Sequence, residues 1–189
     1  MEATPPPRAA LLPHIWLSDE EIRQGQRLLE QLPDKAGTPP IALHPYATHP
    51  DKAWKEAYWR QLMELFESRG IPWIVIGRGN GMEGIPASRN FTNRTSLRET
   101  CALLKSSSLL ITGDSGPMHL AGAVGTPVLA LFGPTTEEWG FFPAGPKDRV
   151  LESQLDCRPC TLHGKKHCDR NHACMQSITP EQVMRALDE

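Results

Sequence analysis

The stretch from Leu109 to Thr135 reads LLITGDSGPMHLAGAVGTPVLALFGPT. An apolar run over 109–112 predicts a buried strand, and a second apolar run over 128–132 predicts another. Between the two runs, Asp114-Ser115 supplies helix-capping side chains, and Pro117 suits the first turn of a short helix. The stretch therefore predicts a strand, a tight turn, a helix and a second strand, which together form a βαβ unit.

The turn of this unit is the first candidate for a functional site. It is expected at the carboxyl end of the first strand, where open α/β sheets bind their ligands. The free N–H groups at the start of the helix suit a phosphate. A fold alone requires none of Asp114, Ser115 or His119 in this turn. We therefore interpret these three side chains as functional.

The same alternation of strands and helices extends upstream. Apolar runs over 41–44 and 73–76 predict two further strands, and the periodicity over 54–69 predicts the helix between them. A capping box at Ser96-Leu97-Arg98-Glu99 opens another helix, which leads into the strand at 109–112. Four strands alternating with three helices predict an α/β fold with a doubly wound parallel sheet of the Rossmann-like type.

Roughly the first forty residues precede this pattern. Residues 1–17 are rich in proline without periodicity and predict a tether, and a capping box at Ser18-Asp19-Glu20-Glu21 opens a linking helix. We therefore divide the chain into a tether with linking helix over 1–40 and a ligand-binding domain over 41–189. A final amphipathic helix is expected to close that domain.

Composition excludes several classes of protein. The 189 residues carry 20 basic and 22 acidic side chains, a net charge of −2, which argues against a general nucleic-acid-binding surface. No apolar run approaches the ~20 residues that span a bilayer. The N-terminus lacks the charged and apolar regions of a signal peptide. We therefore expect a cytoplasmic protein, whose cysteines are thiols or metal ligands rather than disulfides.

A lysine stands out in the loop after the first predicted strand. Lys52 lies at the start of the next predicted helix, where a lysine opposes the helix dipole instead of complementing it. This placement is favourable if an anion lies nearby. A solvated surface lysine is the alternative, and the sequence leaves both open.

Residues 79–84 read GNGMEG and match the dinucleotide-binding pattern G-x-G-x-x-G. Residues 85–88 do not continue as an amphipathic helix, so the pattern lacks the helix that would hold a phosphate, and we discount it. Glu83 in this loop is either a carboxylate acceptor for ribose hydroxyls or an ordinary loop glutamate.

Four cysteines near the C-terminus follow the spacing C-x2-C-x7-C-x5-C within the segment 157–174. They are candidate ligands of a tetrahedral zinc or iron site: Cys157, Cys160, Cys168 and Cys174. The spacing matches no standard zinc ribbon, so reduced thiols are the alternative. The fifth cysteine, Cys101, falls on the apolar face of a predicted helix and is expected to be a small buried residue.

Together these motifs resemble the bacterial heptosyltransferases, the family-9 glycosyltransferases that build the lipopolysaccharide core. The resemblance covers about 41–187 and rests on Lys52-Ala53-Trp54, on the run from Asp114 to His119, on Gly125-Thr126-Pro127 and on the run from Leu131 to Thr135. It implies the GT-B arrangement of two Rossmann-like domains, of which this chain is similar to the C-terminal, donor-binding domain.

The resemblance also implies a donor and the residues that bind it. The donor would be a nucleoside-diphosphate sugar, typically ADP-heptose, and its inverting transfer would require no cofactor. The implied donor-binding residues are Thr48, Lys52, Glu83, Asp114, Ser115, Gly116 and His119. By position, Thr48 and Lys52 would meet the diphosphate or the sugar.

The other implied roles follow from position in the same way. Glu83 would meet the nucleoside, and Asp114 would hold the heptose hydroxyls. Ser115 and Gly116 would offer backbone N–H groups to the phosphates, with His119 beside them. Related enzymes that glycosylate autotransporters carry a four-cysteine iron site, which the cysteine cluster resembles.

The acceptor and the general base are expected in an N-terminal domain that this chain lacks. By resemblance, the acceptor would be the lipopolysaccharide core or a related glycan or protein, and the enzyme would be cytoplasmic, with scope for peripheral association with the inner membrane. No catalytic residue is assigned. The alternatives are a non-catalytic module that binds a sugar nucleotide and an interaction domain stapled by a metal ion.

Overall fold

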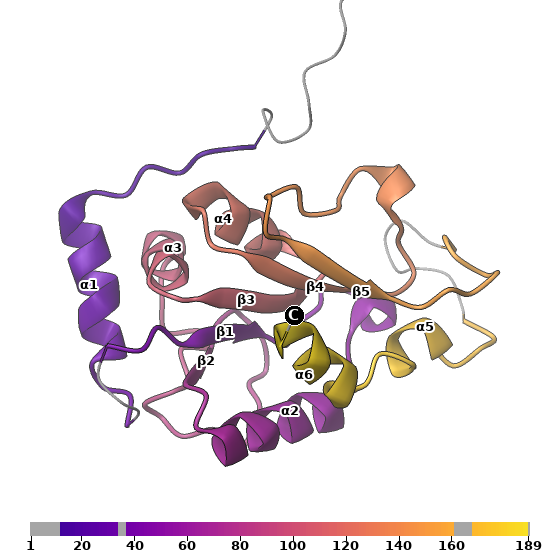
Figure 1. Ribbon diagram of the computed structural model, residues 1–189, viewed down its shortest axis with the longest axis horizontal. Helices are drawn as coiled ribbons and strands as arrows, with labels where there is room; N and C mark the ends of the chain where they lie inside the picture. Colours follow the sequence, from indigo (N-terminus) through magenta and orange to yellow (C-terminus); the bar gives the residue numbers. More distant parts are fainter. Residues whose placement is uncertain (1–11, 34–36, 161–167, 189) are drawn as a thin grey trace, which may run out of the picture.

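A parallel β-sheet lies at the centre of the computed structural model, which describes residues 12–33, 37–160 and 168–188 (Figure 1). In this part of the chain the sheet has five strands in the order β2-β1-β3-β4-β5. The strands are β1 (Ile41–His44), β2 (Trp73–Val75), β3 (Leu109–Gly113), β4 (Val128–Phe132) and β5 (Arg149–Glu152). The doubly wound parallel sheet predicted from the sequence is confirmed.

Helices cover both faces of the sheet (Figure 1). One face carries α2 (Glu56–Arg69) and α6 (Pro180–Asp188), and the opposite face carries α3 (Leu97–Lys105) and α4 (Gly116–Val124), with α1 (Asp19–Leu29) packed outside α3. Short helical turns complete the described elements: η2 (Pro50–Lys52), η3 (Glu137–Trp139) and α5 (Ala173–Gln176).

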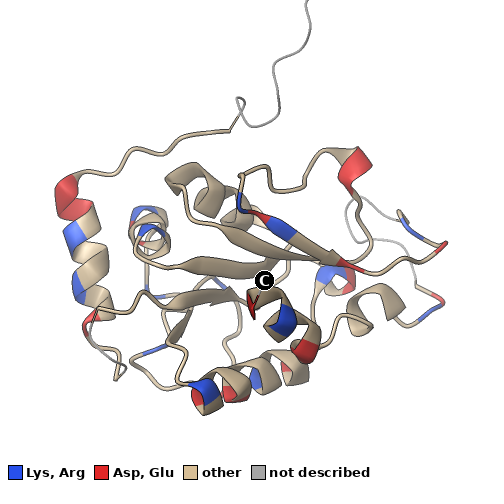
Figure 2. Ribbon diagram, in the orientation of Figure 1, with Lys and Arg blue, Asp and Glu red and all other residues tan. Residues whose placement is uncertain are grey.

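Two hydrophobic cores result, one on each face. Successive strand side chains point to opposite faces, so Leu43 packs with α2 and α6, whereas its neighbour Ala42 packs with α3 and α4. Strands β1, β2 and β4 are buried along their whole length, as expected for a parallel sheet covered on both sides. Figure 2 shows the charged residues mainly on the helices, loops and β5.

Strand β5 lies outside the four strands predicted from the sequence. Its four residues, Arg149–Glu152, are only partly buried and carry a charge at each end. They therefore lack the continuous apolar run by which the other strands were predicted. The strand pairs with β4 in parallel and forms the edge of the sheet.

Both predicted capping boxes form. The Ser18 hydroxyl accepts the Glu21 N–H at the start of α1, and the Ser96 hydroxyl accepts the Glu99 N–H at the start of α3. Helix α2 starts two residues later than predicted, because Trp54 precedes it as a buried side chain whose Nε1 donates to the Ile178 carbonyl over 2.8 Å.

Helix α1 is docked on α3. Arg98 Nε lies 2.6 Å from Glu21 Oε1, and this hydrogen bond lowers the pKa of the Glu21 carboxyl to about 2. The main chain before α1 contacts α4, since the Ile15 N–H donates to the Ala123 carbonyl over 2.9 Å. None of the helices over the described residues is long and apolar enough to cross a bilayer.

Candidate functional site

Three loops meet at the carboxyl edge of the sheet, because β1, β3 and β4 are neighbours. Lys52, in the loop after β1, places its Nζ 2.5 Å from Oδ2 of Asp114, which follows β3. The Thr135 hydroxyl, in the loop after β4, donates to the same carboxylate oxygen over 3.1 Å. One carboxylate thus joins three segments that are distant in sequence.

This ion pair is largely withdrawn from water. The side chains of Lys52 and Asp114 are 14% and 9% exposed. Removing two charges from water is costly, and close pairing with further hydrogen bonds offsets that cost. Thr135 is fully buried and supplies one such bond. A buried charge pair at the ligand-binding edge of an α/β sheet is a candidate recognition site for a polar ligand.

The N-terminus of α4 lies directly beside the pair. Ser115 is the residue before the helix, but its side chain does not cap it. Pro117 has no N–H, and the Met118 N–H donates to the Ser115 carbonyl. Over the described residues, the N–H groups of Ser115 and Gly116 are left without a partner and are available to an anion.

The Ser115 hydroxyl belongs instead to a small buried network. Its Oγ lies 2.9 Å from Thr112 Oγ1 and 3.2 Å from Nδ1 of His44, and the same Nδ1 lies 3.0 Å from Thr112 Oγ1. Burial lowers the pKa of the His44 imidazole to about 4. The ring is therefore neutral at physiological pH.

A cavity of about 450 Å³ adjoins this network. It lies between the loop after β1, the loop after β2 and the starts of α3 and α4, and its lining residues are His44, Tyr46, Ala47, Thr48, Gly77, Arg78, Thr95, Leu97, Thr100, Ser115, Gly116, Pro117 and Leu120. Three residues predicted as donor-binding, Thr48, Ser115 and Gly116, are among them. We call it the α4 cavity.

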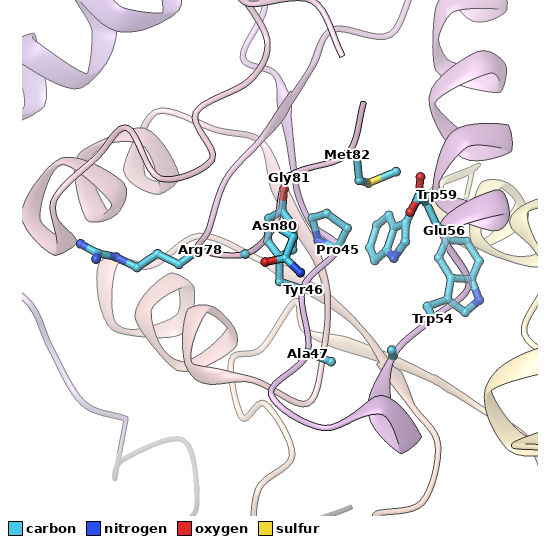
Figure 3. Close-up of a pocket in the computed structure, with 12 residues that line it drawn as sticks. Pro45, Tyr46, Ala47, Trp54, Glu56, Trp59, Arg78, Asn80, Gly81 and Met82 are labelled. Carbon is cyan, nitrogen blue, oxygen red and sulfur yellow. The ribbon is translucent and has the colours of Figure 1, made fainter. Parts of the chain in front are cut away.

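Figure 3 shows the lining of a second cavity, of about 420 Å³, which shares Tyr46 with the α4 cavity. Its walls include Trp59 and Glu56 from α2 and Met82 from the loop after β2. Tyr46 lines both cavities, and its hydroxyl is held 2.7 Å from Thr92 Oγ1. This second cavity contains none of the predicted donor-binding residues.

Glu83 and His119 line neither cavity and, unlike Lys52 and Asp114, take no part in the ion pair. Glu83 is exposed, and its main-chain oxygen accepts a hydrogen bond from Arg60, while its neighbour Met82 is buried in the cavity wall. His119 is exposed on α4 and lines neither cavity. The structure thus brings together Thr48, Lys52, Asp114, Ser115 and Gly116, but not these two.

The cysteine-rich segment does not assemble the predicted metal site. Across residues 12–33, 37–160 and 168–188, no group of three or more histidine, cysteine, aspartate or glutamate side chains is placed to hold a metal ion. Part of the segment, residues 161–167, lies outside the described residues. Over the described residues, the four cysteines therefore do not form the predicted tetrahedral group.

Sequence reasoning missed His44, Thr112 and Thr135 as site residues. Each follows or ends an apolar run, where a single histidine or threonine is indistinguishable from a residue that only ends a strand. It also missed Arg158, which is buried and donates to the carbonyls of Gly133 and Thr135 in the loop after β4. No local pattern marks these contacts, since they span more than 20 residues.

Comparison with known proteins places the chain among glycosyltransferases. Residues 12–169 match the model of glycosyltransferase family 9 (heptosyltransferase). Lipopolysaccharide heptosyltransferase 1 of Pseudomonas aeruginosa is 35% identical over 153 residues, covering 74% of this chain and 40% of that protein. Lipooligosaccharide heptosyltransferase 2 of Campylobacter jejuni is 33% identical over 150 residues, covering 70% and 44%.

Among solved structures, a family 9 glycosyl transferase from Veillonella parvula superposes with a TM-score of 0.74 at 25% identity, over 93% of this chain and 52% of that one. The chain therefore spans about half the length of the relatives that it matches. The family model covers most of the sequence. The chain belongs to glycosyltransferase family 9, the heptosyltransferases.

Proposed function

We propose that this chain binds the nucleoside-diphosphate sugar donor of a heptosyltransferase-like glycosyl transfer, with ADP-heptose as the donor. The observation that carries the proposal is the largely buried Lys52–Asp114 pair beside the N-terminus of α4, where Ser115 and Gly116 line the α4 cavity. Its neighbours offer both kinds of group that such a donor needs, namely cationic or N–H groups for phosphate and a carboxylate for sugar hydroxyls.

A lysine and the N-terminus of α4 are proposed to bind the diphosphate of the donor. The Lys52 ammonium, which is paired with Asp114, and the N–H groups of Ser115 and Gly116 offer hydrogen-bond donors at one part of the sheet edge. Glycosyl transfer releases a nucleoside diphosphate, whose developing charge must be stabilised in the transition state. A lysine and a helix N-terminus supply that stabilisation without a metal ion.

The sugar end is served by Asp114. A carboxylate accepts hydrogen bonds from vicinal hydroxyls, and the Thr135 hydroxyl fixes the orientation of the carboxylate. The choice of a heptose rests on the family and on the names of its relatives, the lipopolysaccharide and lipooligosaccharide heptosyltransferases. Thr48, on the cavity wall, is proposed to contact the diphosphate or the sugar.

Glu83 and His119 are also proposed to bind the donor, although both side chains are exposed and line neither cavity. Glu83 would have to turn towards the nucleoside, and His119 would contact the donor from the exposed side of α4. The transfer itself is proposed to be inverting, with an acceptor hydroxyl attacking the sugar from the face opposite the diphosphate. The acceptor is proposed to be a lipopolysaccharide core or a related glycan or protein.

Calorimetric titration with ADP, ADP-heptose and UDP-glucose tests the proposal. We expect ADP-heptose to bind more tightly than UDP-glucose, and Lys52→Ala or Asp114→Ala to weaken that binding by at least about tenfold. Lys55→Ala is the matched control, because Lys55 lies on the same loop but pairs with Gln176 on the surface. Equal affinities for wild type and the Lys52 variant would contradict the proposal.

The alternative functions give different results. A non-catalytic sugar-nucleotide module predicts binding without transfer when acceptor and a matching N-terminal domain are supplied. A domain stapled by zinc or iron predicts bound metal after anaerobic purification, which elemental analysis detects, although the placement of Cys157, Cys160, Cys168 and Cys174 does not favour it.

A further inference from the structure

His44 lies at the floor of the α4 cavity, and its two ring nitrogens have different surroundings. The side chain is only 6% exposed, yet it lines the cavity. Nδ1 contacts Thr112 Oγ1 and Ser115 Oγ, whereas Nε2 has no hydrogen-bond partner in the part of the chain that the structure describes.

The hydrogen bonds around Nδ1 favour one of the two neutral forms of the ring. The Thr112 hydroxyl can give its single hydrogen to the Gly113 carbonyl, 3.1 Å away, and in that arrangement it accepts from its other neighbours. It accepts from Nδ1–H of His44 at 3.0 Å and from the Ser115 hydroxyl at 2.9 Å. Nδ1–H is then shared between Thr112 Oγ1 and Ser115 Oγ, which lies 3.2 Å from Nδ1, so the three hydrogens serve all four contacts. If Nδ1 were unprotonated, two acceptors would face each other at 3.0 Å.

In this arrangement Nε2 is the unprotonated nitrogen. Burial lowers the pKa of His44 to about 4, so the ring stays neutral and Nε2 keeps its lone pair at neutral pH. The lone pair cannot be turned away, since the bonds at Nδ1 fix the plane of the ring.

A glycine keeps this edge of the ring uncovered. A Cβ at Gly77 would lie 2.5 Å from His44 Cδ2 and 2.9 Å from Nε2, closer than real Cβ contacts. The φ of Gly77 is +122°, a conformation that other residues rarely adopt. Gly77 also lines the α4 cavity. Any side chain at this position would cover the nitrogen that the network leaves exposed to the cavity.

We propose that Nε2 of His44 is a specificity-determining hydrogen-bond acceptor for a hydroxyl or amino group of the nucleotide sugar bound in the α4 cavity. The inference rests on the proposed donor function and assigns it one further binding residue. An ionised diphosphate has no hydrogen to donate, so Nε2 contacts the nucleoside or the sugar and repels a phosphate oxygen. His44 thereby fixes which part of the donor lies over the floor of the cavity.

Two substitutions separate the roles of the two nitrogens. His44→Asn places an amide group near the position of Nδ1 and nothing at Nε2, whereas His44→Gln reaches the position of Nε2 with an amide that can accept. We expect His44→Asn to weaken ADP-heptose binding about three- to tenfold, the equivalent of one neutral hydrogen bond, and His44→Gln to weaken it less. Binding of inorganic diphosphate should be the same in both variants and in wild type.

Titration with ADP alone shows which part of the nucleotide sugar donates the hydrogen bond to Nε2. A loss of affinity for both ADP and ADP-heptose in His44→Asn places the contact on the nucleoside, and a loss for ADP-heptose only places it on the sugar. Either result supports the proposal. Equal binding of ADP-heptose by His44→Asn and wild type, with circular dichroism showing both folded, overturns it.

Nitrogen-15 NMR of the histidine rings gives a readout independent of affinity. In the free protein, Nε2 of His44 should show the resonance of an unprotonated nitrogen, which shifts on addition of ADP-heptose while the Nδ1 resonance stays in place. Protonation of Nε2 on binding, or no shift at saturation, overturns the inference while leaving the donor function intact. If wild type binds no nucleotide sugar, both proposals fail together.

Discussion

Lys52 Nζ and Asp114 Oδ2 lie 2.5 Å apart, although 62 residues separate them in the sequence. The contact joins the loops after β1 and β3 and is largely shielded from solvent. It is therefore part of the architecture of the carboxyl edge as well as a candidate ligand site. Stability and binding should respond together when the pair is broken.

Breaking the pair from one side should destabilise the protein. Lys52→Met or Asp114→Asn leaves the other charge nearly buried and unpaired, and we expect each to cost about 3 kcal/mol, the lower end for buried pairs because both side chains retain slight exposure. The double variant should cost less than the sum of the singles. Urea unfolding of the four proteins measures this, and strictly additive costs would show that the two charges do not interact.

The neutral, buried imidazole of His44 predicts a pH dependence of stability. Its pKa is about 4 in the folded protein and 6.5 when unperturbed, so between these values the unfolded chain binds a proton that the folded chain does not. Stability therefore rises with pH through this window. From about pH 7.5 to about pH 5 we expect His44 to account for a loss of about 2 kcal/mol.

Urea titrations of wild type and His44→Gln at the two pH values measure the effect. The variant lacks the titrating ring, so its stability should change by about 2 kcal/mol less than that of wild type over this interval. The comparison cancels the contributions of the remaining ionisable groups, which both proteins share. Parallel pH profiles would mean that His44 is accessible to protons in the folded state.

The sequence predicted those parts of the fold that depend on local pattern. The apolar runs of β1, β2, β3 and β4 and the capping boxes at Ser18 and Ser96 are visible in a few consecutive residues. Strand β5 was missed because its edge position needs no continuous apolar run. Strand β5 forms by pairing with β4, and this pairing exists only in the assembled sheet.

The site was predictable to the same extent. The positions of Lys52 and Asp114 in their loops made each of them a candidate site residue, but nothing in the sequence indicated that they pair. Thr135 and His44 complete the network through contacts that only the strand order creates. Glu83 shows the converse, since the family resemblance implied a role for it in the site, whereas its side chain is exposed in the loop after β2.

The packing of α1 on α3 can be tested with a pair of glycines. A Cβ at Gly25 would lie 2.7 Å from the carbonyl carbon of Ala102, so Gly25→Ala forces the helices apart, whereas a Cβ at Gly122 in α4 meets nothing within 4 Å. Alanine is the better helix former by ~1 kcal/mol. We therefore expect Gly122→Ala to stabilise by up to about 1 kcal/mol and Gly25→Ala to destabilise by ~1–3 kcal/mol.

Thermal unfolding of both variants measures the difference in sign. The two substitutions are chemically identical and both lie within helices, so helix propensity cannot account for opposite effects. If Gly25→Ala were also stabilising, α1 would not be docked closely on α3, and the ion pair between Glu21 and Arg98 would be the main contact between the two helices.

Arg158 is expected to position the site without touching the ligand. Its side chain is 4% exposed; Nη2 donates to the Thr135 carbonyl over 2.9 Å and pairs with Glu152 Oε2 over 2.7 Å, and Nε donates to the Gly133 carbonyl. The planar guanidinium thus holds the loop whose threonine hydroxyl orients Asp114. A lysine ammonium cannot donate hydrogen bonds to all of these acceptors in the same fixed geometry.

We therefore expect Arg158→Lys to leave buried carbonyls unsatisfied, to destabilise the protein by at least about 2 kcal/mol and to weaken ADP-heptose binding. Arg170→Lys is the matched control, because Arg170 forms an exposed pair with Asp156, and such pairs contribute little. Urea unfolding and calorimetry on both variants separate the effects. If Arg158→Lys lost stability but bound ADP-heptose like wild type, the loop after β4 would keep its conformation without Arg158, and the orientation of Asp114 would depend on Thr135 and Lys52 alone.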